Sequence, residues 1–161
     1  IIGTGPGNDS KMSEDKIKAY KNFANKLWNI TRFILSYTEG IVYDPQFKDF
    51  SDADKTLITE RDEILLTITK EMEEYKFYLV AERLYAYLWH GFADAIIEES
   101  KPILKDGTDN ERESRQWLLK HIFIESLKLL HPFMPFITEE IYQQLPLKEK
   151  MQLLMIEKWP T

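Results

Sequence analysis

Hydrophobic residues recur every three or four positions along most of the chain, the spacing that places side chains on one face of an α-helix. The first such run predicts a helix from about Ser13 to Tyr37. Ser13 is suited to cap its start, and Gly40 closes it. Its apolar stripe consists of Tyr20, Phe23, Leu27, Ile30 and Ile34.

A second helix is expected after a loop. Ser51 and Asp54 resemble a capping arrangement, and the pattern then extends to about Glu74. Arg61 interrupts the apolar stripe of this helix. Its long side chain can either extend toward solvent or pair with an acid inside the bundle.

Two more long helices follow. The third should span about 78–100 and stop at the Lys101-Pro102 pair, because proline disfavours helical backbone in the residue before it. The fourth should span about 111–131. Its apolar face is the broadest in the chain, so we expect it to be the most buried helix.

Prolines divide the last part of the chain. A short fifth helix is expected to begin at Pro135 and to stop by Pro146, and the phenylalanines of the preceding HPFMPF turn should form a rigid, buried corner. The tail 147–161 looks extended. No segment alternates as a hairpin would. The predicted fold is therefore all-α, an up-down helical bundle of about four long helices plus a short fifth.

Length and composition narrow the class further. The chain has 161 residues, 43% of them hydrophobic and 30% charged, which fits one folded domain. It has no cysteine, no visible signal peptide and no apolar run long enough to span a membrane. We expect a cytoplasmic protein with no membrane association, and, since the chain opens on two isoleucines, an excised part of a longer one.

No catalytic or metal-binding pattern is visible. The three histidines, His90, His121 and His131, lack metal-ligand spacing, and the glycines near the start lack a P-loop lysine. Neighbouring glutamates such as Glu98 and Glu99 diverge by about 100° on a helix and are most simply solvated charge. We expect no catalytic residue, metal or cofactor in this segment.

The first predicted helix carries a second, polar stripe nearly opposite the apolar one. The chain has a net charge of −6, yet residues 11–37 contain six Lys or Arg against two acids. At about 100° per residue, the members of the stripe lie within about 60° of one another. The stripe is Asn22, Lys26, Asn29 and Phe33, flanked by Asn25, Arg32 and Ser36.

An aromatic ring beside amides and cations is suited to unstacked nucleic-acid bases. Phe33 would be the stacking surface, the asparagines would read base edges, and Lys26 and Arg32 would meet phosphates. The alternative is a solvated face with one stray phenylalanine covered by the loop 38–50. These residues alone leave both interpretations open.

Four segments carry specific motifs: NFANKLWNITRFIL (22–35), LYAYLWHGFADAIIEESKP (84–102), LLHPFMPFITEEIYQQL (129–145) and KWP (158–160). In this order they resemble the anticodon-binding domain of class I aminoacyl-tRNA synthetases of the Val/Leu/Ile/Met group, with the valyl enzymes the nearest match. The resemblance covers nearly the whole chain.

The resemblance implies a helical bundle that grips the anticodon arm of a tRNA, here tRNA(Val). The remaining domains of the parent enzyme would ligate valine to that tRNA with ATP and Mg, so this segment alone should be inactive. In valyl enzymes, the positions that match Lys26 and Phe33 lie against anticodon bases. Ile97 matches an apolar residue that also approaches the anticodon.

The same resemblance divides the chain into the end of a stem-contact or linker segment (1–13), the bundle (14–146) and a tail leading to further regions (147–161). Two departures stand out. Asp15 replaces an arginine that valyl enzymes can offer to RNA, and Ala95-Ile96 replaces an aromatic pair next to Ile97. An isoleucyl, leucyl or methionyl enzyme, or a helical protein-interaction module anchored by Phe33, remains the alternative.

Overall fold

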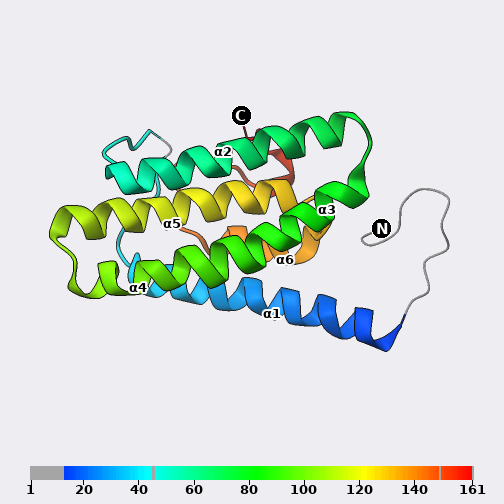
Figure 1. Ribbon diagram of the computed structural model, residues 1–161, viewed down its shortest axis with the longest axis horizontal. Helices are drawn as coiled ribbons and strands as arrows, with labels where there is room; N and C mark the ends of the chain where they lie inside the picture. Colours follow the sequence, from blue (N-terminus) through cyan, green and yellow to red (C-terminus); the bar gives the residue numbers. More distant parts are fainter. Residues whose placement is uncertain (1–12, 45, 149, 161) are drawn as a thin grey trace.

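The computed structural model describes residues 13–44, 46–148 and 150–160, and these form an all-α bundle (Figure 1). Successive long helices run in opposite directions, as the up-down prediction required. The elements are α1 (Glu14–Tyr37), α2 (Asp52–Glu73), α3 (Phe77–Ala86), the π-helix η1 (Tyr87–Ile96), α4 (Ile97–Asp106), α5 (Asp109–Leu130), α6 (Pro135–Gln144) and the 3₁₀ turn η2 (Leu154–Ile156).

Two of the predicted helix starts, those of α1 and α2, are confirmed by their capping hydrogen bonds. Ser13 Oγ accepts from the backbone N–H of Lys16 at 3.3 Å, and Ser51 Oγ accepts from that of Asp54 at 3.2 Å. Helix α5 begins two residues before the predicted position, behind a capping box made by Thr108. Local chemistry therefore fixes where these three helices start.

The predicted end of the third helix is wrong. Elements α3, η1 and α4 follow one another as a single rod that passes through Pro102 and ends at Asp106. Proline removes one helical hydrogen bond, but Leu104 beyond it is buried where α4 packs against α5. Tertiary packing thus outweighs the local preference to stop.

The middle of this rod is wider than an α-helix. The backbone N–H of Ile97 bonds to the carbonyl of Phe92, five residues back. Such a turn holds more residues than an α-turn, so side chains beyond it are rotated from where a regular helix would place them. The widened segment faces α1 and forms one wall of the site described below.

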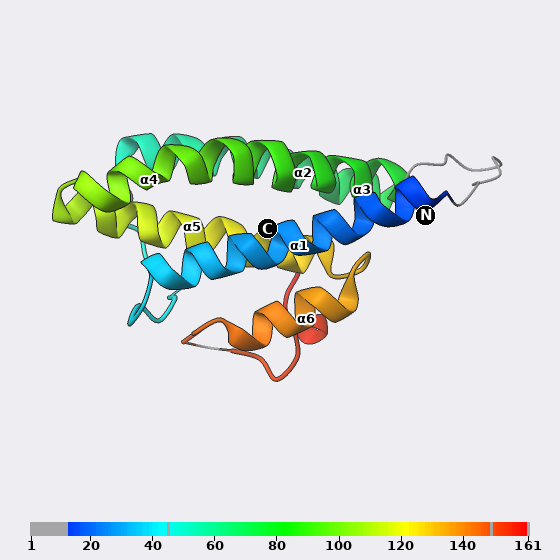
Figure 2. The same cartoon turned by 90° about the horizontal axis from the view of Figure 1, so that it is seen from below.

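Helix α5 is the most buried helix of the described chain, as predicted. Twelve of its residues are buried, and it packs against α1, α2, the third rod and α6. Figure 2 shows α6 and the C-terminal tail on the side of α1 and α5 that is turned away from α2.

The corner before α6 differs from the prediction. Phe133 is half-buried, but the ring of Phe136 is 90% exposed. The first turn of α6 buries Thr138 and turns Phe136 outward, since only one face of a surface helix can meet the core. The corner is still tied, because Thr138 Oγ1 lies 2.8 Å from His131 Nδ1.

The tail is extended only in part. Tyr43 and Leu147 form an isolated parallel bridge, and the short turn η2 buries Leu154. Near the end of the described chain, Trp159 Nε1 donates to Thr69 Oγ1 of α2 at 3.0 Å. These contacts attach the segment after α6 to the bundle.

Arg61 is buried and points inward, but its partner inside the bundle is a histidine where an acid was expected. Its Nη2 lies 2.5 Å from Nε2 of His121, and Nδ1 of the same ring lies 2.6 Å from the Tyr43 hydroxyl. Arginine can only donate, so Nε2 must accept and Nδ1 must carry the proton that His121 donates to Tyr43. Burial and the nearby guanidinium lower the pKa of His121 to about 4.

This network predicts acid sensitivity. An unfolded histidine has a pKa of about 6.5, above the folded value of about 4. Between these two pH values the unfolded chain binds one more proton at this ring than the folded chain does, so the folded state loses stability as the pH is lowered. We expect His121 to contribute a loss of about 3 kcal/mol in unfolding free energy over that window. Urea titrations at several pH values measure it.

In the same titrations, His121→Gln should flatten the curve, because glutamine can accept from Arg61 and donate to Tyr43 without titrating. The exposed His90 supplies the matched control: His90→Gln removes only a surface contact with Asp94, so most of the acid-dependent loss should remain. An identical pH dependence in His121→Gln and the wild type would contradict the role of the ring.

Candidate functional site

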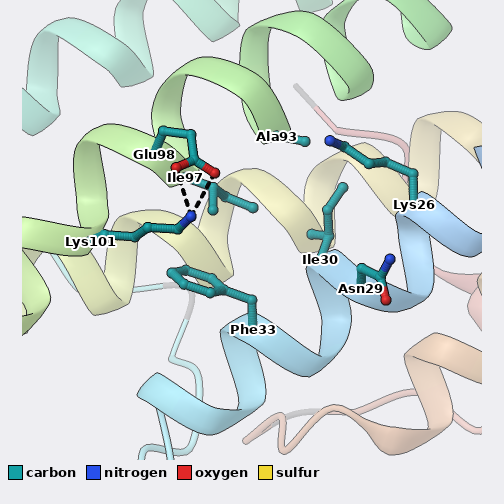
Figure 3. Close-up of a pocket in the computed structure, with 8 residues that line it drawn as sticks. All are labelled: Lys26, Asn29, Ile30, Phe33, Ala93, Ile97, Glu98 and Lys101. Carbon is teal, nitrogen blue, oxygen red and sulfur yellow. Dashed lines mark hydrogen bonds and ion pairs between the residues drawn. The ribbon is translucent and has the colours of Figure 1, made fainter.

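Helix α1 meets the third rod at a pocket of about 230 Å³. It is lined by Lys26, Asn29, Ile30, Phe33, Ala93, Ile97, Glu98 and Lys101. Figure 3 shows side chains of both helices directed into the same space. Segments at least 60 residues apart in sequence thus build one site.

The pocket contains four of the seven residues predicted to bind nucleic acid: Lys26, Asn29, Phe33 and Ile97. A second hollow of about 420 Å³ adjoins it along α1, lined by Asn29, Arg32, Phe33 and Ser36. Asn29 and Phe33 belong to both. The other two predicted residues, Asn22 and Asn25, are exposed on α1 outside these two hollows.

Phe33 is half-buried and lies between the two hollows. Its ring packs on Tyr37 of the next turn, with centroids 4.8 Å apart and planes tilted by 44°. One side of the ring therefore rests on the protein. Because the ring also lines both hollows, another side of it is accessible to a ligand. Such a ring is oriented in advance of binding.

The amine of Lys26 does not extend freely into solvent. Its Nζ lies 2.8 Å from Oδ1 of Asp94 and 5.5 Å from the centre of the Trp89 ring. The hydrogen bond from Lys26 lowers the pKa of the Asp94 carboxyl, and a weaker contact with His90 acts in the same direction. An ammonium group has three N–H donors, so this pairing orients Lys26 without using all of them.

Ile97 is only 6% exposed and contributes an apolar wall rather than a projecting contact. Glu98 and Lys101 were not predicted as site residues. The four-residue spacing of Ala93, Ile97 and Lys101 is visible in the sequence, but only the packing of the rod against α1 shows that this face lines the pocket.

The end of α1 has no basic residue of its own to meet its last carbonyls, and α5 supplies the donors instead. Gln116 Nε2 donates to the Tyr37 carbonyl at 2.6 Å, and Lys120 Nζ donates to the carbonyls of Thr38 and Ile41. Burial lowers the pKa of Lys120 to about 8. These bonds hold the turn of α1 that follows Phe33.

No group of three or more metal-ligating side chains lies together in the described ranges. Helices long and apolar enough to cross a bilayer are also absent from that part of the chain.

Comparison with known proteins decides the family. The family model for the anticodon-binding domain of tRNA ligases matches residues 54–161. The chain belongs to this family.

Individual relatives span almost all of this chain. The chain is 40% identical over 154 residues to the valine–tRNA ligase of Thermotoga maritima, an alignment that covers 96% of this chain and 17% of the relative. It is 39% identical over 149 residues to the valine–tRNA ligase of Bdellovibrio bacteriovorus, with 88% of this chain and 17% of the relative covered. It is 35% identical over 161 residues to that of Bacillus subtilis, with 99% of this chain and 18% of the relative covered. The chain thus spans less than a fifth of the length of these relatives.

The capping of α1 by α5 gives a testable consequence. Lys120→Met removes the donor to the Ile41 carbonyl and should lower the unfolding free energy by about 1–3 kcal/mol. Urea denaturation measures the loss. The matched control is Lys105→Met, an exposed lysine of α4, which should change stability by less than about 0.5 kcal/mol. Equal stabilities for the two variants would show that Lys120 does not hold the end of α1.

Proposed function

We propose that this chain is the anticodon-binding domain of a valyl-tRNA synthetase and that it binds the anticodon arm of tRNA(Val). The observation that carries the proposal is the pocket between α1 and the third rod. It combines an oriented aromatic ring (Phe33), an ammonium group (Lys26), an amide (Asn29) and an apolar wall (Ile97). Those are the groups that single-stranded RNA recognition uses.

The choice of valine is supported by the relatives described above, which are all valine–tRNA ligases from bacteria. Under this proposal, ATP, Mg and valine are bound by other domains of the parent enzyme. This chain then contributes no catalytic residue and works in the cytoplasm, where charged tRNA is used.

Each group in the site has a defined task. A base splayed out of the anticodon loop stacks on Phe33, which contributes on the order of 1–3 kcal/mol. Lys26 keeps one N–H on Asp94 and offers another to a base edge or a phosphate. Arg32 and Asn29 meet the neighbouring nucleotide in the second hollow.

Binding energy gained at this distance from the reaction acts through positioning. The parent enzyme must hold the acceptor end of the tRNA at a remote active site, and correct anticodon contacts help to keep it there. The effect therefore belongs in kcat/KM for tRNA, not in amino-acid activation.

The stacking role of Phe33 is tested in the full-length enzyme. Phe33→Ala should lower kcat/KM for tRNA roughly tenfold, because the stacked base loses its platform. ATP–pyrophosphate exchange should be unchanged, since no tRNA takes part in it. Phe136→Ala is the matched control: this ring is exposed on α6 and lies outside both hollows, so charging should be unaffected. A parallel loss of exchange and charging in Phe33→Ala would contradict the assignment.

Salt dependence separates RNA from a protein partner of the same surface. Binding of an anticodon hairpin to the chain should weaken steeply as salt rises, because phosphate contacts release counterions. Fluorescence anisotropy over a salt series gives the slope, and Arg32→Gln should reduce it. A hairpin affinity that does not change with salt would argue against the proposal and in favour of an apolar protein contact.

A further inference from the structure

The outer wall of the pocket is an ion pair that the proposed function leaves unexplained. Lys101 Nζ lies 2.7 Å from Oε1 and 2.6 Å from Oε2 of Glu98, so one ammonium group holds both carboxylate oxygens. Both side chains line the pocket that Phe33 enters (Figure 3). They are about half exposed, at 56% for Glu98 and 49% for Lys101.

A carboxylate beside an RNA site needs a reason, because it repels phosphate. Here the repulsion is limited, since Lys101 neutralises Glu98 just as Lys26 is paired with Asp94 across the pocket. The four charges sum to zero. The pocket itself is therefore suited to an uncharged base, and phosphates are better met outside it by residues such as Arg32.

The pairing also fixes what Glu98 can do. A carboxylate only accepts hydrogen bonds, and each of its oxygens has two lone-pair sites. Lys101 uses one site on each oxygen, which leaves one on each for a ligand. Glu98 is thus an oriented acceptor at the rim of a pocket whose floor is aromatic and aliphatic.

We propose that Glu98 accepts a hydrogen bond from the exocyclic amino group of the base stacked on Phe33, with Lys101 as the residue that positions it. The inference rests on the proposed function and adds the class of base: adenine, cytosine or guanine, and not uracil, which has no exocyclic amine. Lys26 contacts the remaining edge of the same base.

The experiment deletes the amine from the RNA and the acceptor from the protein. An anticodon hairpin is prepared in which each anticodon base bearing an exocyclic amine is replaced in turn: adenosine by purine riboside, guanosine by inosine, cytidine by its 4-deamino analogue. Fluorescence anisotropy gives the Kd of each hairpin for the 161-residue chain. At one position, loss of the amine should weaken wild-type binding about tenfold.

The protein variant should remove that difference. In Glu98→Met, the hairpins with and without the amine should bind within about twofold of each other, which is the signature of two groups that interact directly. Lys101→Met should shrink the difference as well, because Glu98 loses its anchor. A merely structural role for the pair would change all Kd values together and leave their ratio intact.

The matched control is Glu99→Met. Glu99 is the next residue of α4 and is also exposed, but it does not line the pocket, so the tenfold ratio should persist. A full ratio in Glu98→Met, or no position in the wild type that responds to loss of its amine, would overturn the inference while hairpin binding itself is retained. Absence of salt-sensitive hairpin binding to the wild-type chain would instead overturn the proposed function, and this inference with it.

Discussion

The organisation of this molecule depends on one constraint: helix α5 is buried along most of its length, so its polar side chains need partners from other elements. Arg115 bonds to Asp54 at the start of α2 at 2.8 Å, and both groups are almost fully buried. Lys120 donates hydrogen bonds to the carbonyls after α1, and His121 accepts a hydrogen bond from Arg61 of α2. Each bond fixes a neighbouring element against α5, because the alternative is a buried polar group without a partner.

The site inherits its geometry from that arrangement. Helix α5 holds the end of α1 through Gln116 and Lys120, and it also packs against α4 on the other side of the pocket. The distance between Phe33 and Ile97 therefore depends partly on contacts made elsewhere in the bundle. A pocket held in this way exists before a ligand arrives, so binding need not order two helices first.

Several features were predictable because their causes are local. The starts of α1 and α2 follow from Ser13 and Ser51, whose hydroxyls accept from backbone N–H groups three residues on. The end at Pro102 was predicted wrongly for the opposite reason: the packing of Leu104 against α5 decides it, and no local rule includes that contact. The predicted burial of Phe136 was wrong for the same reason, since the motif does not determine which way its ring points.

The sequence by itself determined the all-α class, the four long helices and the polar stripe of α1, because helical periodicity and capping depend on residues within a turn or two of one another. Only the tertiary structure decided that Phe33 is half-buried, that Asp94 holds Lys26, and that Glu98 and Lys101 face the same pocket. These facts depend on how α1 crosses a rod widened at its centre, and helix crossing is set by packing across the whole bundle.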